Sequence, residues 1–313
     1  MHRRRVLSST LLLFLVVMSV LSQLPANAIA ATSIPQKSLK QHMKTLKSSP
    51  EMPVMFVGHG SPMNAIEDNA YRRDWQALGL EFGDGKKYPT PNLILCISAH
   101  WLTHGWWLTG MQNPKTIHDF AGFPQELFAQ QYPAPGAPAV AEEISKQLVS
   151  PIPKGFVGVN MDKWGLDHGT WSVLKPMFPA ANIPVMQLSM DYSRAPVEHL
   201  LLGQQLRDFR HQGVLIVGSG NIVHNLRMMG DVKPYDWNVE FDAITAGLIA
   251  DRNYDELANF QKLGKLAEIA HPTYEHYLPL LYAAGAVDAK DDVSTFNDNL
   301  TLGSISMRSV IWS

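Results

Sequence analysis

The sequence predicts a single α/β domain with a central, mostly parallel, twisted sheet and helices on both faces. Short apolar runs rich in Val, Ile and Leu recur along the chain, and they lack the polar alternation of strands that face water on one side. Stretches with helical spacing separate several of these runs, as in βαβ units. Because no internal repeat, low-complexity stretch or linker interrupts residues 51–313, we expect this region to form one domain.

Four apolar runs are expected to form buried strands, at residues 54–58, 93–98, 185–190 and 214–218. Their unbroken apolar character is typical of strands that are covered on both faces. The single cysteine, Cys96, lies inside the second run, so the sequence excludes an intramolecular disulfide and predicts a buried structural thiol.

Two stretches carry apolar residues three and four positions apart and are expected to form helices. They are APAVAEEISKQLV at residues 137–149 and VEHLLLGQQLRDFRHQG at residues 197–213. The second stretch ends on Gly213, where a helix favours a glycine cap. Helices between strands of this kind would cover the faces of a parallel sheet.

Composition favours a globular protein and excludes one class of partner. Hydrophobic residues make up 46% of the chain and charged residues 17%, which is enough apolar material for a large core. The formal net charge is −2, and no basic block or basic stripe with interleaved aromatic residues follows the first five residues. We therefore expect no nucleic acid partner.

Residues 1–30 have the features of a bacterial signal peptide. A basic start, MHRRR, precedes the apolar run LLLFLVVMSVL, and PANAIA offers cleavage after Ala28 or Ala30. The apolar run is too short for a comfortable membrane span, so we expect no stable membrane anchor after cleavage. The protein is therefore expected to be exported to the periplasm. Arg3 and Arg4 also fit a twin-arginine signal, but ordinary signals carry such pairs as well, and the export route stays open.

Residues 31–50 are polar and carry several lysines, and they are expected to form a flexible mature N-terminus. His42 belongs to this segment and is given no functional role.

Histidines follow three of the predicted strands. His59 and His100 come directly after the first two strands, and His224 follows the fourth strand beyond a glycine turn expected at residues 218–220. Ligands of open α/β sheets bind beyond the carboxyl ends of the strands, so these imidazoles could meet in one crevice. A fourth candidate, His276, is expected in the first turn of an apolar helix, whose positive end would disfavour its protonation. Imidazole nitrogens suit Zn, Fe, Cu and Ni.

Each of these features also has a simpler explanation. A single histidine at a strand end is more often a turn residue or a substrate contact than a metal ligand, but four at comparable positions favour a site. The sequence HGS at residues 59–61 also occurs near the start of sirohydrochlorin-type chelatases. GSG at residues 218–220 lacks both the Lys-Ser/Thr of a phosphate loop and the frame of a serine nucleophile. Trp106 and Trp107 are expected to serve packing.

Seven motifs in order resemble the 4,5-DOPA extradiol dioxygenase family, which is part of the class III extradiol ring-cleaving dioxygenases typified by the protocatechuate 4,5-dioxygenase catalytic subunit. The motifs are GHGSPMNAIEDN (58–69), SAHW (98–101), TIHDFAGFP (116–124), YPAPG (132–136), WGLDHGTW (164–171), GSGNIVHNL (218–226) and PTYEHYLPLLYAAG (272–285). The resemblance covers nearly all of residues 52–313. The resemblance does not extend to the front of the chain. The bacterial members of the family are cytoplasmic, whereas this chain begins with a predicted signal peptide.

The resemblance implies roles for six histidines. His59, His100 and His276 would bind the metal, and His224 would be the active-site acid/base or a fourth ligand. His118 and His168 would line the substrate pocket. Asp167, next to His168, could orient that imidazole or another ligand from outside the metal's own shell.

The same resemblance implies one mononuclear divalent metal per chain, with a catechol and O2 as substrates. Fe(II) would support dioxygenase activity. The broader superfamily uses two histidines and a carboxylate, whereas this chain has His276 in the third place with Glu275 beside it, so Zn(II) is a second candidate. Three functions remain open at this point, namely a catechol dioxygenase, a zinc hydrolase of the same architecture, and a non-catalytic periplasmic metal-binding or chelatase-like protein. The resident metal, the true catechol and the oligomeric state are not fixed by the sequence.

Overall fold

The computed structural model describes residues 44–151 and 155–313, which belong to one compact unit, Leu39–Ser313. The predicted signal peptide at residues 1–30 lies outside the described residues. Within the described ranges no helix is both long and apolar enough to cross a membrane.

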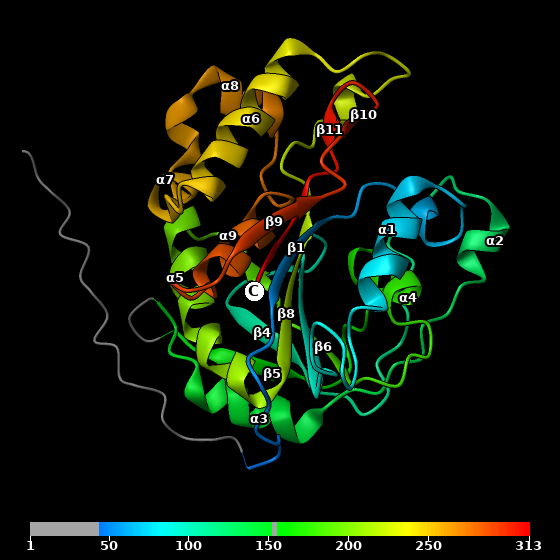
Figure 1. The fold of residues 1–313 in the computed structure, drawn as a ribbon, viewed down its shortest axis with the longest axis vertical. Coiled ribbons are helices and arrows are strands. Elements are labelled where there is room, and N and C mark those ends of the chain that lie inside the picture. The colour runs from blue at the N-terminus through cyan, green and yellow to red at the C-terminus, as the bar shows by residue number, and fades with distance from the viewer. Residues whose placement is uncertain (1–43, 152–154) are drawn as a thin grey trace, which may run out of the picture. The chain divides into compact units, whose positions relative to one another are not determined.

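A six-stranded sheet forms the centre of the domain, with the strand order β6-β2-β8-β1-β12-β9 (Figure 1). The four neighbours β6, β2, β8 and β1 are parallel, whereas β12 is antiparallel to both β1 and β9. The strands are β1 (Val54–Gly58), β2 (Leu93–Ser98), β6 (Val185–Gln187), β8 (Val214–Gly220), β9 (Val293–Phe296) and β12 (Ser309–Trp312). The predicted mostly parallel sheet is confirmed.

Helices cover both faces of this sheet, as predicted. Alternate residues of β1 enter two separate apolar clusters, with Val54 and Phe56 in one and Met55 and Val57 in the other. Figure 1 shows α5 (Pro196–Leu206) and α9 (Leu278–Gly285) on one side, and α1 (Ala70–Gly79) and α4 (His168–Met177) on the other. The remaining helices are α2 (Gln125–Phe128), α3 (Pro138–Gln147), α6 (Asp236–Ala250), α7 (Tyr254–Ala258) and α8 (Lys265–Ala270).

The predicted elements agree closely with these bounds. Helix α3 occupies the first predicted helical stretch, and α5 continues into a 3-10 turn that ends at Gly213 with φ of 75°. The third predicted strand is divided, because β6 is followed by the separate strand β7 (Met190–Asp191), which pairs with β3 (Leu102–Thr103).

The glycine turn predicted at residues 218–220 is wrong, since β8 continues through Gly220 and pairs with β1 from Ile216 to Gly220. The two glycines serve a close approach instead. A Cβ atom on Gly218 would lie 2.4 Å from the carbonyl oxygen of Pro279, and one on Gly220 would lie 2.1 Å from that of His276. Only glycine lets residues 276–279, at the start of α9, lie directly on the strand.

Besides the pair β3-β7, the described residues form two other two-stranded sheets. Strands β4 (Trp106–Thr109) and β5 (Val157–Asn160) are parallel, and β10 (Leu300–Thr301) and β11 (Ile305–Ser306) are antiparallel. Trp106 is fully buried and donates a hydrogen bond to the Tyr282 hydroxyl at 2.8 Å, which agrees with a packing role.

Part of the N-terminal segment that was expected to be flexible is hydrogen bonded to the domain. The Thr45 hydroxyl contacts Glu143 of α3 at 2.6 Å, and the Ser49 amide donates to the His211 carbonyl at 3.0 Å. Cys96 is buried as predicted, and burial raises the pKa of its thiol.

Candidate metal centre

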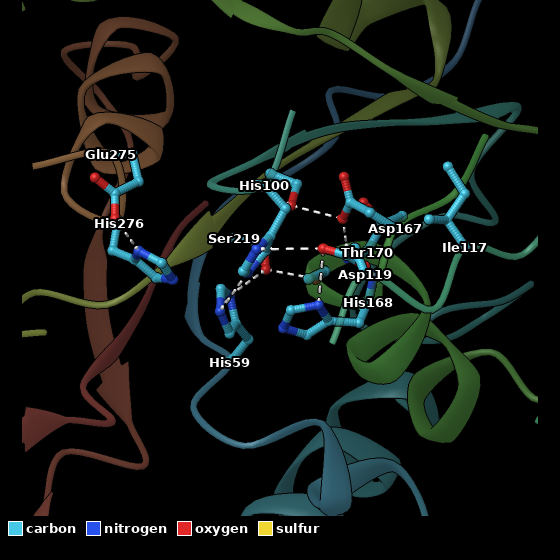
Figure 2. Close-up of polar contacts among 12 residues, drawn as sticks. His59, His100, Ile117, Asp119, Asp167, His168, Thr170, Ser219, Glu275 and His276 are labelled. Carbon is cyan, nitrogen blue, oxygen red and sulfur yellow. Dashed lines mark hydrogen bonds and ion pairs between the residues drawn. The ribbon is translucent and has the colours of Figure 1, made fainter. Parts of the chain in front are cut away.

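The candidate site lies at the carboxyl ends of three neighbouring parallel strands. His59 directly follows β1, His100 follows β2 by two residues, and His224 follows β8 by four. His168 is the first residue of α4, and His276 lies just before α9. Figure 2 shows the rings of His59, His100 and His168 turned toward one another, with His276 and Glu275 entering from the opposite side.

His276 is held on β8 by its own backbone. Its carbonyl oxygen accepts a hydrogen bond from the Asn221 amide at 2.9 Å, and it is the same oxygen that a Cβ atom on Gly220 would meet. The prediction that His276 lies in the first turn of the helix is wrong, because α9 begins at Leu278. The pKa of His276 is lowered well below its ordinary value, first by burial and then by the neighbouring imidazoles. Burial, rather than the helix end, is thus what favours a neutral ring.

Three of the rings form a nearly equilateral triangle. Ring centroids are 5.1 Å apart for His59 and His100, 5.3 Å for His59 and His276, and 5.1 Å for His100 and His276. The Nε2 atoms of His59 and His100 are 3.2 Å apart. Nitrogens bound to one tetrahedral zinc at 2.0–2.1 Å are about 3.3–3.4 Å apart, so this spacing fits a shared cation.

Each ring of the triangle has its Nδ1 atom beside an oxygen. Nδ1 of His59 is 3.0 Å from the Ser219 hydroxyl, Nδ1 of His276 is 3.0 Å from a Glu275 carboxylate oxygen, and Nδ1 of His100 is 3.3 Å from Asp119 Oδ2. A carboxylate beside Nδ1 favours a ring proton at that atom, which leaves the Nε2 lone pair available to a metal.

The tautomer of His59 follows from proton counting. The Ser219 hydroxyl donates its only proton to the Gly169 carbonyl at 2.5 Å. Ser219 must therefore accept from His59, so Nδ1 of His59 carries the proton and Nε2 carries the lone pair.

Burial keeps these imidazoles neutral, which is the form that binds metal. It is the largest cause lowering the pKa of His59 well below its ordinary value and the pKa of His100 to about 3. The donor set of neutral nitrogens, with carboxylates behind two of them, fits a divalent ion such as Zn(II) or Fe(II).

His224 lies against His276 in a stacked arrangement. Their ring centroids are 3.5 Å apart with an interplanar angle of 8°. Burial first, and then the neighbouring imidazole of His168, lowers the pKa of His224 to about 4. Ligand atoms of His224, Glu275 and His276 all lie within 4.8 Å of one another, so both a proton-transfer role and a ligand role are open to His224.

His168 lies on the other side of the triangle. Its ring centroid is 3.9 Å from that of His100, and ligand atoms of His59, His100 and His168 lie within 4.8 Å of one another. His118 lies outside this group. Its Nε2 donates to the Gln130 carbonyl at 2.9 Å, and its ring contacts Phe120, Phe128 and Trp171.

Of the two roles open to Asp167, orienting His168 or another ligand, the first belongs to a different carboxylate. Its carboxylate caps α4 at the Thr170 amide and accepts from Ser98 and Gln187, each at 2.7 Å. The carboxylate beside His168 is Asp119, whose Oδ2 lies 3.0 Å from Nδ1 of that ring. Sequence reasoning missed Asp119 although it stands inside the quoted motif TIHDFAGFP, directly after His118.

The chain is similar to known ring-opening enzymes over most of its length. A family model described as the catalytic LigB subunit of aromatic ring-opening dioxygenase matches residues 53–306. The 4,5-DOPA dioxygenase extradiol of Escherichia coli K12 is 43% identical over 271 residues, which cover 85% of this chain and 96% of that protein. The protein of the same name from Beta vulgaris is 37% identical over 236 residues, covering 74% and 85% of the two chains.

A solved structure has the same fold. The crystal structure of an uncharacterized protein from Escherichia coli K12 matches with a TM-score of 0.69 and 38% identity, over 84% of this chain and 100% of that one.

Proposed function

Because the chain belongs to the family of catalytic LigB subunits of aromatic ring-opening dioxygenases, we propose that it opens the ring of a DOPA-like catechol beside the two hydroxyl groups, using O2 and one divalent metal ion. Membership of this family, together with the similarity to the two 4,5-DOPA dioxygenases, identifies the chain as an extradiol dioxygenase. The observation that best supports the metal is the triangle of His59, His100 and His276, with an oxygen beside every Nδ1 atom.

In this proposal His59, His100 and His276 hold the metal through Nε2, and we favour Fe(II) for activity. The chemistry that bound iron supplies is electron transfer between the catechol ring and O2, a reaction that is otherwise slow. The product would be a muconate semialdehyde that contains both atoms of O2.

The proton transfers are assigned to His224. Because burial lowers its pKa to about 4, its ring is neutral near pH 7, which is the form that can accept a proton. In this proposal the proton comes from a catechol hydroxyl. The same ring would return that proton when the O–O bond breaks. Positioned proton transfer of this kind contributes about 10²–10⁴-fold to a rate.

A zinc-dependent hydrolase is the second candidate, because three neutral histidines are also a ligand set that catalytic zinc prefers. A non-catalytic metal-binding or chelatase-like role is a third. Family membership favours the dioxygenase over both.

Anaerobic reconstitution separates these functions. Protein loaded with Fe(II) under argon is mixed with L-DOPA and then with air, and oxygen uptake is followed together with the formation of a yellow product. We expect one O2 consumed per catechol opened with Fe(II), and no uptake with Zn(II). Fe(II) bound at one per chain without oxygen uptake for any catechol tried would refute the proposal.

Export is part of the proposal. We expect mature protein from the native cell to begin after Ala28 or Ala30, because the sequence before these residues has the basic and apolar parts of a signal peptide. N-terminal sequencing of protein from the periplasmic fraction measures this directly. An intact Met1 on the native protein would contradict the assignment.

We expect His118→Ala and His168→Ala to weaken catechol binding while metal content stays near one per chain. Neither ring belongs to the triangle, and Nε2 of His118 is engaged with the Gln130 carbonyl. Metal analysis and catechol titration of the zinc-loaded variants provide the two measurements. Loss of metal from His168→Ala would move that residue into the set of ligands.

A further inference from the structure

Asp119 occupies a segment that is fixed beside the start of α4. The Ile117 amide donates to the Leu166 carbonyl at 2.7 Å, and the Trp171 indole donates to the Ile117 carbonyl at 2.9 Å. Asp119 Oδ1 then accepts the backbone amide of His168 at 2.9 Å. A carboxylate at a helix N-terminus is stabilised by the partial positive charge of the first amides.

The second oxygen of Asp119 lies between two imidazoles that come from different elements (Figure 2). Oδ2 is 3.0 Å from Nδ1 of His168 and 3.3 Å from Nδ1 of His100. Nδ1 of His168 is buried without a well-aligned hydrogen bond, so the nearby negative charge is what compensates its polarity.

The contacts of the Asp119 carboxylate are those of a hydrogen-bond acceptor, since Oδ1 accepts a backbone amide and Oδ2 faces the Nδ1 atoms of two imidazoles. An ionised carboxylate only accepts hydrogen bonds, so it favours an N–H over a lone pair at each Nδ1 atom.

We propose that Asp119 is a positioning residue that serves two imidazoles at once, keeping the ring proton of both His100 and His168 on Nδ1 so that both present an Nε2 lone pair to the site. The inference rests on the proposed function in taking His100 as a metal ligand. It adds a direct link between that ligand and a residue of the substrate pocket.

The link gives His168 a defined part in substrate recognition. Figure 2 shows its second ring nitrogen turned toward His59, on the side of the metal ligands. With the proton on Nδ1, this Nε2 atom accepts hydrogen bonds and does not donate them. The pocket at this point therefore selects a hydrogen-bond donor, such as a hydroxyl of the catechol.

Asp119→Asn tests the link with almost no change of shape. An amide has one accepting and one donating end, so it cannot accept from the His168 backbone amide and from both Nδ1 atoms. We expect the affinity for Zn(II), measured by competition with a chromophoric chelator, to fall about 10–100-fold, as is typical when a partner of a metal-binding histidine is removed. In ¹⁵N-histidine NMR spectra of the zinc form, the Nδ1–H tautomer of His100 and His168 should be lost or mixed.

Asp191→Asn is the matched control. Asp191 is also a buried aspartate with a lowered pKa, but its carboxylate accepts from the Gly105 amide and from Ser193 and Arg194. Its loss should change zinc affinity by less than about twofold, within the spread expected for a group outside the site. An equal loss of affinity in the two variants would mean that general destabilisation is the cause, and would overturn the proposal.

Two further outcomes are decisive. Folded Asp119→Asn protein with wild-type zinc affinity and unchanged tautomers would overturn the role of Asp119. If this variant does not fold, the wild-type zinc form decides alone, because an Nε2–H tautomer at His100 or His168 contradicts the proposal. Wild-type protein that binds no zinc or iron at all would instead contradict the proposed function.

Discussion

His59→Ala is expected to leave the protein without bound metal and without dioxygenase activity. The ring of His59 is almost completely buried, and it lies within 5.3 Å, between ring centroids, of both other proposed ligands. A site of three ligands rarely holds its ion with two. Metal per chain is measured by elemental analysis after gel filtration in a chelator-free buffer, and it should approach zero.

His104→Ala provides the control, because His104 is an exposed histidine that belongs to neither group of close ligand atoms. It should bind one metal per chain. Thermal unfolding of both metal-free variants separates loss of a ligand from loss of the fold, since the cavity left by an imidazole also lowers stability. Full metal content in well-folded His59→Ala would remove this residue from the proposed ligands.

His224→Gln is expected to keep the metal and to lose turnover by about two to four orders of magnitude. The ring is stacked on His276, with the two ring centroids 3.5 Å apart, and from there it can reach a substrate bound at the triangle. Glutamine preserves polarity and size but cannot transfer the proton. The measurements are metal stoichiometry, catechol affinity of the zinc form, and oxygen uptake of the iron form.

The metal content of His224→Gln is to be compared with that of His59→Ala. If His224 is a fourth ligand, the two variants should lose metal together, and a zinc ion closed in by four histidines would be structural or inhibited. Equal metal loss would therefore assign His224 to the ligands and leave the proton transfer without its proposed group.

Local patterns were enough to predict most of the elements that carry the site. The apolar runs at 54–58 and 93–98 coincide with β1 and β2, because strands buried on both faces have no polar alternation to confuse their limits. From the strand ends alone, His59 and His100 could be expected at one edge of the sheet, and the structure brings them together.

Contacts between distant segments could not be predicted in this way. Ser219 was assigned to a turn because glycines flank it, yet those glycines are required by the backbone of residues 276–279, which a local pattern does not contain. Asp119 meets His168 only because residues 115–117 pair with Leu166. Asp167 is nearer to His168 along the chain, which is why the sequence suggested it as the orienting carboxylate. In the structure its carboxylate instead caps α4 and accepts a hydrogen bond from Ser98.

The ladder of backbone hydrogen bonds in the sheet continues right up to the proposed ligands. The His59 amide donates to the Gly220 carbonyl at 3.0 Å, and the Ala99 amide, next to His100, donates to the Ser219 carbonyl at the same distance. Two of the three imidazoles are thus attached to hydrogen-bonded strands whose residues are all buried. Strands of this kind are among the last parts of a domain to open. We therefore expect that a metal ion lost from the proposed site can be replaced in the folded protein, so that activity returns on reloading and the chain does not have to be synthesised again.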